Sequence, residues 1–482
     1  MGVLTVETVS PAPARPVERW VEYSAFVIFV VLTIITVYYH EPWSDEANSW
    51  LLGRDATLVQ LWTRLMHYEG TPGLWQTLLH VLIRLGLPYA GMNYFSGALG
   101  CAAAWVFVRK APLALPIRLL MPFTFYLFFQ YSVVARSYCL LPVLLFVCAW
   151  AYPRAKEKLG LITLLLCLMG GVSVHGMIIA GTIWLCIHWQ LLRMRRELGK
   201  PARRKICALA LTYIAVTLLM AWSAWPARDV LFAAERDYSF DHLVESTSET
   251  LANAFTGEWI SSLAMVIACL PFLWRGGGLF MFLVSGIALC FFNAYVYANV
   301  WHEGMPFLAW LFAMWISGAA VKAKWISILG LIAMAAVVAV QCYWAIETTA
   351  YDWENPYSGS RETARYLREN GIIQAGVQGF GFGAVAVQPY FDRNIFPNFR
   401  HGEASAYYDW SEAYRNFDGL EDLAKTQPEY VLVGYKDGGE QILTGRTVKK
   451  SGYKLIKHFE GDLFWHDDVL EPDAFDLYRR IH

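Results

Sequence analysis

Charged residues are scarce in this sequence, at 16% of 482 residues against 56% hydrophobic residues. The mean hydropathy of +0.36 excludes an ordinary soluble protein of this length. The formal net charge is only −1, so no basic excess indicates a nucleic-acid partner. Apolar stretches of about 17 or more residues recur instead, each close to the length that a bilayer core requires.

Cysteine is missing from the polar C-terminal part, and no CxxC motif occurs. The nine cysteines all lie in apolar runs. We therefore expect buried, packed cysteines, with no disulfide bonds and no zinc sites. The segment up to Glu18 also lacks a cleavage-site pattern, and the apolar run after it is too long for a signal-peptide core. The first span is therefore expected to be retained.

The apolar runs predict an all-α polytopic membrane protein with about eleven to thirteen transmembrane helices. Eleven spans are placed at about 21–39, 91–108, 114–132, 136–152, 158–174, 175–192, 205–224, 258–274, 278–298, 304–321 and 324–346. A twelfth candidate, 72–87, would be only about 24 Å long as a helix, and it carries His80 and Arg84.

The basic loop residues set the expected orientation. If 72–87 lies at the outer interface, every basic loop falls on one side, as the positive-inside rule requires. These residues are Arg15, Arg19, Arg109, Lys110, Arg118, Arg154, Lys156, Lys158, the cluster from Arg193 to Lys205, Arg275, Lys322 and Lys324. We therefore predict an inner (cytoplasmic) membrane protein with a cytoplasmic N-terminus, an external first loop at 40–90, and a periplasmic or external C-terminus.

In this predicted orientation, the polar residues that are unusual beside membrane spans lie on the external side. They are Asp45, Glu46, His67, Glu69, Arg136, Arg228, Glu235, Asp237, His302 and Glu303. Each one alone is explained as a solvated surface charge. Together they place the candidate chemistry on the outer face.

The composition changes near residue 347, where charged and turn-forming residues become frequent. We predict a transmembrane domain over 1–346 and a small soluble α/β domain over 347–482. Buried-type strands are expected at 430–433, 453–458 and 474–478.

Three further local predictions concern this C-terminal domain. Ser360 is expected to cap a helix that ends before Gly371. Residues 418–421 have the spacing of a capping box. The glycine-rich stretch 379–383 lacks the lysine and the following helix of a phosphate-binding loop, and we expect a flexible loop there.

Asp45 and Glu46 directly follow the first span, in the stretch His40–Trp50. One interpretation is structural, because Ser44 can cap a short helix and two acids in its first turn suit the helix dipole. A second is catalytic, because an inverting glycosyl transfer needs a carboxylate to take a proton from the acceptor hydroxyl. A third is a divalent cation bound by the pair. No other cofactor is indicated.

Two other stretches of the outer face carry candidate residues. His67, Glu69 and Trp75 flank Pro72, which suits the first turn of a helix. This helix either lies at the membrane surface or forms a wall of a cavity below Asp45. Arg136 stands between two spans, where it either reaches lipid headgroups or binds a lipid-linked phosphate.

A third external loop holds His302 and Glu303. His302 could donate to a phosphate or bind a metal ion, and a solvated turn is the alternative. His175, between two apolar runs, is expected to be a core or interface histidine.

The order of these motifs resembles that of integral-membrane glycosyltransferases of the GT-C superfamily. The branch is the one with protein O-mannosyltransferases and lipid A aminoarabinose transferases. Asp45-Glu46-Ala47-Asn48-Ser49-Trp50 is the acidic pair after the first span, and Ala135-Arg136-Ser137-Tyr138 matches Ala-Arg-x-Tyr. Thr71-Pro72-Gly73-Leu74-Trp75 resembles a Pro-Pro-Leu-aromatic helix start with one proline lost. Trp301-His302-Glu303-Gly304 resembles Arg-His-x-Gly with Trp in place of Arg. The resemblance runs from residue 20 to about 310. The basic residue that often precedes Pro-Pro is absent, and Glu69-Gly70 stand there.

The resemblance implies transfer of a hexosyl or pentosyl group from a polyprenyl-phosphate donor to a lipid, glycan or protein acceptor outside the membrane. Asp45 would be the base and Glu46 would support it. Arg136 and His302 would hold the donor phosphate, with His67, Glu69, Trp75, Tyr138 and Glu303 around the cavity or the acceptor. Membrane lipids are the remaining expected partners.

Two alternatives belong to other functional classes. A transporter or flippase of lipid-linked saccharides would need polar residues at mid-depth in the spans, and these spans are nearly free of charge. A non-catalytic assembly protein on the same scaffold is the third interpretation, and the intact Asp45 argues against it only mildly.

Overall fold

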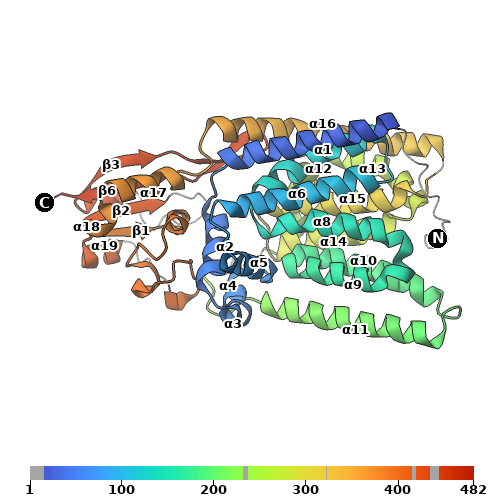
Figure 1. Ribbon diagram of the computed structural model, residues 1–482, viewed down its shortest axis with the longest axis horizontal. Coiled ribbons are helices and arrows are strands. Elements are labelled where there is room, and N and C mark those ends of the chain that lie inside the picture. Colours follow the sequence, from blue (N-terminus) through green and yellow to red (C-terminus); the bar gives the residue numbers. More distant parts are fainter. Residues whose placement is uncertain (1–15, 232–236, 322, 415–419, 435–444, 482) are drawn as a thin grey trace.

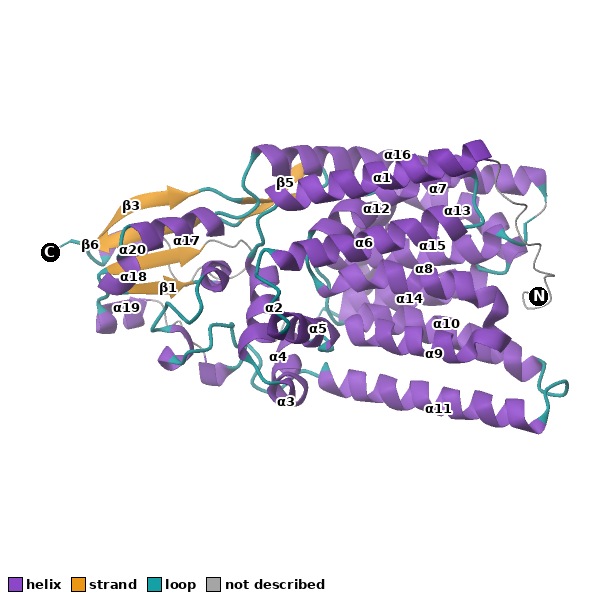
Figure 2. Ribbon diagram, viewed as in Figure 1, coloured by secondary structure: helices purple, strands orange, loops and turns teal. Residues whose placement is uncertain are grey.

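The computed structural model describes residues 16–231, 237–321, 323–414, 420–434 and 445–481. Helices form an elongated bundle, and the main sheet belongs to the C-terminal domain at one end of it (Figures 1 and 2). Helix α1 (Pro16–Tyr39) begins at the opposite end. The protein is thus a helical membrane protein with a small α/β domain, as the sequence predicts.

Seven stretches of the described chain are long and apolar enough to cross a membrane. They are α1, α6 (Gly91–Lys110), the stretch Ser137–Val172, α10 (Val174–Arg193), α11 (Lys200–Ser223), α13 (Trp259–Gly276) and α16 (Lys324–Glu354). The stretch Ser137–Val172 contains η4 (Ser137–Cys139), α8 (Leu140–Ala151), η5 (Tyr152–Arg154) and α9 (Ala155–Val172). Because α8 and α9 pack against each other, this stretch accounts for two of the predicted spans.

The remaining predicted spans fall on shorter or broken elements. Two of them are α14 (Leu279–Tyr295) and α15 (Gly304–Gly318). The third, 114–132, is divided into α7 (Leu115–Leu120), η2 (Met121–Phe123) and the π-helical η3 (Tyr126–Val133). Proline in the first turn of both α7 and η2 explains the breaks, since proline lacks the N–H that would continue a preceding helix.

Helix α12 (Phe240–Phe255) was not predicted, because its sequence carries Asp241, Glu245 and Glu249. It packs against α13, α14 and α15 with one apolar face.

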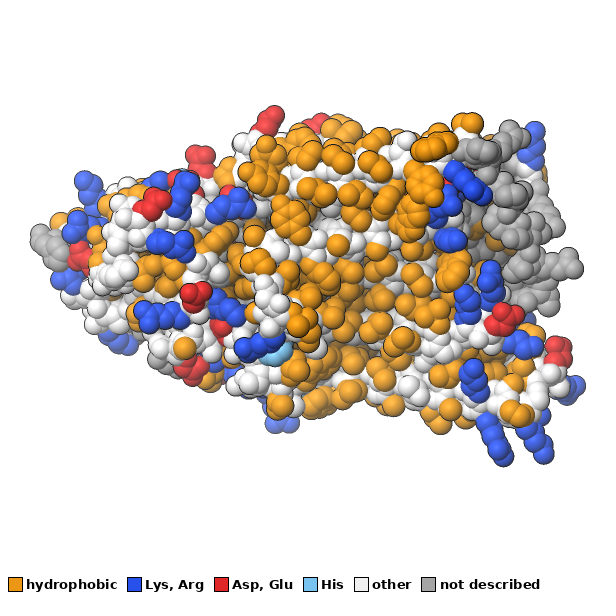
Figure 3. All heavy atoms as spheres, in the orientation of Figure 1, with side chains coloured by type: hydrophobic (Ala, Val, Ile, Leu, Met, Phe, Trp, Pro, Cys, Tyr) orange, Lys and Arg blue, Asp and Glu red, His pale blue; other side chains and the backbone are white. Residues whose placement is uncertain are grey.

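The surface of the bundle is hydrophobic along its flank, and basic side chains gather at the end away from the C-terminal domain (Figure 3). This distribution is what a bilayer around the bundle requires.

The first loop forms a layer of short helices between the bundle and the C-terminal domain (Figure 1). They are α2 (Ser44–Asp55), α3 (Leu58–Gln60), η1 (Leu61–Leu65), α4 (Met66–Glu69) and α5 (Leu74–Arg84). Helix α5 has 11 residues, about 16 Å, which is too short to span a bilayer. This length agrees with the prediction that 72–87 does not cross.

The C-terminal domain contains a four-stranded sheet in the order β1-β2-β6-β3. Its strands are β1 (Val377–Phe380), β2 (Tyr430–Gly434), β3 (Tyr453–Phe459) and β6 (Phe475–Arg480), and β1–β2 is its parallel pair. A separate hairpin joins β4 (Asp462–Trp465) and β5 (Asp468–Pro472). The helices are α17 (Ser360–Glu369), α18 (Ile372–Ala375), α19 (Leu420–Thr426) and α20 (Gly445–Lys450), with η7 (Phe382–Tyr390), η8 (Phe399–Gly402) and η9 (Glu412–Tyr414).

All three strands expected in this domain are confirmed as β2, β3 and β6. The flexible loop expected at 379–383 is wrong, because the chain forms β1 there and then turns at Gly381, whose φ is 84°. Gly359, not Ser360, occupies the cap position of α17. Asp418 of the predicted capping box lies outside the described residues.

Candidate functional site

Helix α2 positions the acidic pair at the junction between bundle and domain. Its cap residue is Trp43, and the Glu46 carboxylate accepts the Trp43 backbone N–H at 3.3 Å. The expected Ser44 cap is therefore wrong, since Ser44 is already inside the helix. The Glu46 side chain is fully buried, whereas that of Asp45 is 23% exposed. Adjacent helical residues point about 100° apart, so the two carboxylates face different surroundings.

Asp45 forms an ion pair with Arg136. The distance from Arg136 Nη2 to Asp45 Oδ2 is 3.0 Å. Arg136 lies in extended backbone between η3 and η4, so the two partners come from the ends of two separate helical segments. The predicted base and the predicted phosphate ligand are thus in direct contact.

Aromatic rings surround the Arg136 guanidinium. Its central carbon lies 5.5 Å from the ring centre of Trp43, 5.4 Å from that of Tyr138 and 5.9 Å from that of Trp301. Cation–π contacts of this kind favour the charged arginine. The Arg136 Nη1 atom is buried and has no hydrogen-bond partner among the described residues. A buried guanidinium with an unused N–H group is suited to an anionic ligand.

His302 contacts this group through Tyr138, whose hydroxyl lies 2.6 Å from His302 Nε2. Burial, together with His175 and Arg136, holds the pKa of His302 well below its usual range. His302 is therefore a neutral imidazole near neutral pH and cannot hold a phosphate as a cation. His175 stacks on it with ring centres 4.4 Å apart and contacts Asn293, which agrees with the core role expected for His175.

Glu46 uses both carboxylate oxygens for hydrogen bonds within the protein. Oε1 accepts the Ala135 backbone N–H at 2.6 Å and the Asn93 amide at 2.7 Å. Oε2 accepts from Trp43 and lies 3.2 Å from His40 Nε2. Because these partners occupy its oxygens and Arg136 pairs with Asp45, the acidic pair does not fit a divalent cation. No group of three potential metal ligands is found among the described residues.

Glu69 also belongs to this site. Its Oε1 accepts from the Asn48 amide at 3.1 Å. Burial raises the pKa of Glu69 to about 8, with a further rise from Asp45 and Asp409 and a partial offset from Arg136. Glu69 is therefore largely protonated at neutral pH, which limits the negative charge beside Arg136.

The structure places the other predicted site residues elsewhere. His67 Nδ1 lies 2.7 Å from the Trp225 carbonyl oxygen at the end of α11. Trp75 is fully buried against Phe95, so its ring packs inside the protein and does not face lipid. Burial raises the pKa of Glu303 to about 8, and its carboxylate approaches Asn253 of α12 rather than Asp45.

Sequence reasoning missed several residues of the site. Trp43 and Trp301 flank Arg136, and their rings are 4.9 Å apart. Asn48 joins the site to the C-terminal domain, because its Oδ1 accepts the Tyr408 backbone N–H at 2.8 Å. Trp43, Asn48 and Trp301 all lie within two positions of a predicted site residue in the chain, and that proximity is the clue that sequence reasoning could have used.

Comparisons of the chain with protein-family models, with curated proteins and with solved structures find no match. The site is thus defined by its geometry. A mostly buried carboxylate–arginine pair lies among aromatic rings and beside a largely neutral acid, at the junction of a membrane bundle and an α/β domain.

Proposed function

We propose that the protein is a membrane glycosyltransferase. It moves a sugar from a polyprenyl-phosphate donor to an acceptor at the external face of the inner membrane. The observation that carries this proposal is the Asp45–Arg136 ion pair, in which Arg136 keeps a buried, unused N–H group. When a hydroxyl displaces a phosphate, one group must stabilise the leaving phosphate and another must accept the hydroxyl proton. The pair brings an anion-binding group and a carboxylate together for these two tasks.

In the proposed reaction, the donor phosphate binds to Arg136, which then shares its N–H groups between the phosphate and Asp45. Asp45 accepts the proton of the acceptor hydroxyl as that oxygen attacks the anomeric carbon. The bond from this carbon to the phosphate oxygen breaks, the configuration inverts, and the phosphate leaves with the bonding electrons. Arg136 stabilises the charge on the departing phosphate.

The C-terminal domain covers the outer side of α2 and is the proposed location of the acceptor. Its 406–411 segment contacts the first loop through three polar side chains. Asp55 accepts the Ala406 N–H at 2.8 Å, Asn48 accepts the Tyr408 N–H, and Arg64 pairs with Asp409 at 2.9 Å. A lipid, glycan or protein acceptor entering between α2 and this segment would approach Asp45.

A transfer assay tests the proposal. Membranes that contain the protein are supplied with radiolabelled polyprenyl-phosphate sugars, and labelled product is measured. Asp45→Asn is expected to lower transfer by about 10²- to 10⁴-fold, the usual value of an acid–base group. The matched control is Glu429→Gln in the C-terminal domain, whose ion-pair partner is Arg479, and transfer is expected to persist there. Wild-type transfer rates in Asp45→Asn would contradict the proposal.

A further inference from the structure

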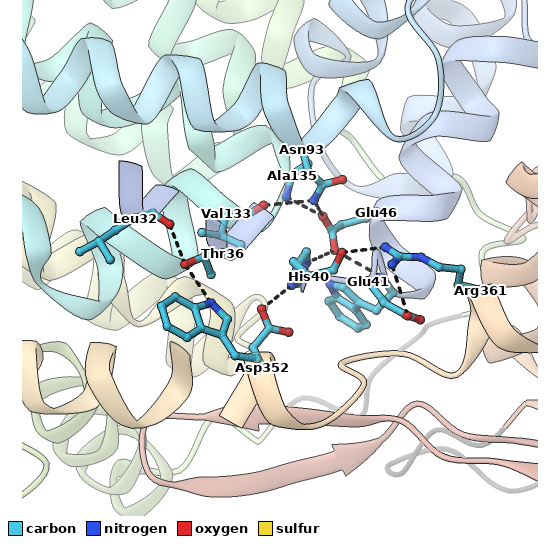
Figure 4. Close-up of polar contacts among 12 residues, drawn as sticks. Leu32, Thr36, His40, Glu41, Glu46, Asn93, Val133, Ala135, Asp352 and Arg361 are labelled. Atoms are coloured by element: carbon cyan, nitrogen blue, oxygen red, sulfur yellow. Dashed lines mark hydrogen bonds and ion pairs between the residues drawn. The ribbon is translucent and has the colours of Figure 1, made fainter. Parts of the chain in front are cut away.

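The short connection between α1 and α2 holds a buried histidine between two carboxylates. His40 Nε2 lies 3.2 Å from Glu46 Oε2, and His40 Nδ1 lies 3.3 Å from Asp352 Oδ2 (Figure 4). All three side chains are completely buried or nearly so. The group is named here the His40 bridge (Glu46, His40 and Asp352).

Hydrogen-bond chemistry fixes the state of this histidine. A neutral imidazole has one N–H donor, whereas the imidazolium has two. Both His40 nitrogens face carboxylate oxygens, and ionised carboxylates only accept, so the imidazolium can donate to Glu46 and Asp352 together. Although burial lowers the pKa of His40, Asp352 and Glu46 outweigh it and raise the pKa to about 10.

One side of the bridge leads to the site described above. Glu46 accepts the backbone N–H of Ala135, the residue directly before Arg136. Glu46 therefore fixes the backbone that carries the Arg136 guanidinium. It takes no part in the proposed reaction itself. It adjoins Asp45 in the chain as well, so both members of the ion pair depend on its position.

The other side leads to the C-terminal domain. Asp352 lies in the last turn of α16, directly before the domain. The first residues of α17 contact the same connection: Arg361 donates to the His40 carbonyl at 3.1 Å, and Ser360 donates to the Pro42 carbonyl at 3.4 Å. Tyr357 packs on the His40 ring with centres 4.7 Å apart. Residues 352–361 thus enclose the α1–α2 connection.

We infer that His40 is a positively charged positioning residue. It holds Glu46, and through Ala135 also Arg136, in fixed register with the stem of the C-terminal domain. The site and the domain then move as one unit. The consequence for a lipid phosphate rests on the proposed function, whereas the charged bridge itself does not.

The charge state is tested by solid-state NMR on protein with ¹⁵N-labelled histidine in lipid bilayers. At pH 8.5 an ordinary histidine is neutral, and we expect one imidazolium resonance that is absent from His40→Gln. Titration of every histidine resonance below pH 7.5 would overturn the inference. This readout needs no substrate, so it is decided separately from the proposed function.

The positioning role is tested by binding of undecaprenyl phosphate to purified protein. His40→Gln and Asp352→Asn are expected to weaken binding by about tenfold, the loss of one hydrogen bond to a charged group. Asp352→Glu, which keeps the charge, should retain affinity closer to wild type than Asp352→Asn does.

Thr36→Val is the matched control. Thr36 accepts from Trp353 Nε1 at 3.3 Å and joins the same two helices, α1 and α16, one turn from His40. Its loss is expected to leave affinity for the probe unchanged. Equal affinity in wild type and His40→Gln would overturn the positioning role, and equal losses in His40→Gln and Thr36→Val would reduce it to general packing. Absence of binding to wild type would instead contradict the proposed function.

Discussion

The two ends of the helical bundle both contain partly buried carboxylate–arginine clusters, and they differ in how the groups are paired. At the end where α1 begins, Glu22 contacts Arg109 and Arg118 with its two oxygens. Glu22 is 1% exposed, and its partners come from α6 and α7. At the end below the C-terminal domain, Arg136 contacts Asp45 through Nη2 while its buried Nη1 has no partner in the described chain.

This difference separates a structural cluster from a candidate ligand site. Glu22 joins three helical segments, and each of its two carboxylate oxygens contacts an arginine. Arg136 lies near three aromatic rings, keeps donor capacity at Nη1 and is 18% exposed. The residue types are alike at both ends, and the Glu22 end also has a buried arginine nitrogen without a partner in the described chain, Arg118 Nε, and aromatic rings beside Arg109. The ends differ in their ion pairs, because Glu22 contacts two arginines with its two oxygens, whereas Arg136 contacts Asp45.

The largest expected effect concerns the placement of these ends on opposite sides of the membrane. Ala404→Cys and Lys200→Cys are introduced into a variant without native cysteines. In intact spheroplasts, a membrane-impermeant thiol reagent should label position 404 fully and position 200 very little. The reverse pattern would place the Asp45–Arg136 end in the cytoplasm.

The next largest effect is expected on lipid-phosphate affinity when one arginine from each end is replaced. Arg136→Ala should weaken undecaprenyl phosphate binding by roughly 10- to 100-fold, since hydrogen bonds to charged groups contribute about 1.5–3 kcal/mol. Arg109→Ala serves as the control and should leave the affinity unchanged. Equal losses in both variants, measured with the same labelled lipid, would remove the distinction between the ends.

Glu22→Gln should lower stability and leave lipid-phosphate affinity unchanged. Removing one member of a buried ion pair leaves uncompensated charge, and partial solvent access to the arginines moderates the cost. We expect the free energy of unfolding to fall by about 2 kcal/mol, without a change in lipid-phosphate affinity. Thermal unfolding in detergent checks the first outcome. A loss of affinity would show that this end also contributes to binding.

The smallest effect is a pH dependence at Glu303. Burial raises its folded pKa to about 8 from an ordinary value of 4.5. The folded state therefore binds the proton more tightly, and this contribution to stability is lost as pH rises from about 4.5 through 8. Glu303→Gln cannot titrate, so its Tm relative to wild type should be higher at pH 8.5 than at pH 5.5, by roughly 2 °C. A pH-independent difference in Tm would contradict this assignment.

The sequence predicts the helical membrane bundle, the short first-loop helix and three strands because each has a local physical cause. Bilayer-length apolar runs specify spans, and strand patterns specify β2, β3 and β6. The prediction fails at 114–132, where prolines break an apolar run, and at α12, where acidic residues conceal an apolar face. Burial of Trp75 was also missed, since its chain neighbours do not show what packs above them.

The same distinction between local sequence features and tertiary packing applies to the candidate site. Asp45 and Arg136 could be proposed together because both adjoin span ends on one predicted side. The His40 bridge could not, because its two carboxylates come from positions 6 and 312 residues away in the chain. The contact of Asn48 with Tyr408 joins residues 360 apart. Such partners become neighbours only through tertiary packing.

The most direct test of the central claim is a cryo-electron microscopy map of the protein in lipid nanodiscs with undecaprenyl phosphate. We predict phosphate density within hydrogen-bond distance of Arg136 Nη1, between the Trp43 and Trp301 rings and beside Asp45. A map of Arg136→Ala under the same conditions should lack this phosphate density. Phosphate density at another place in the protein, with the Asp45–Arg136 pair unchanged, would contradict the account.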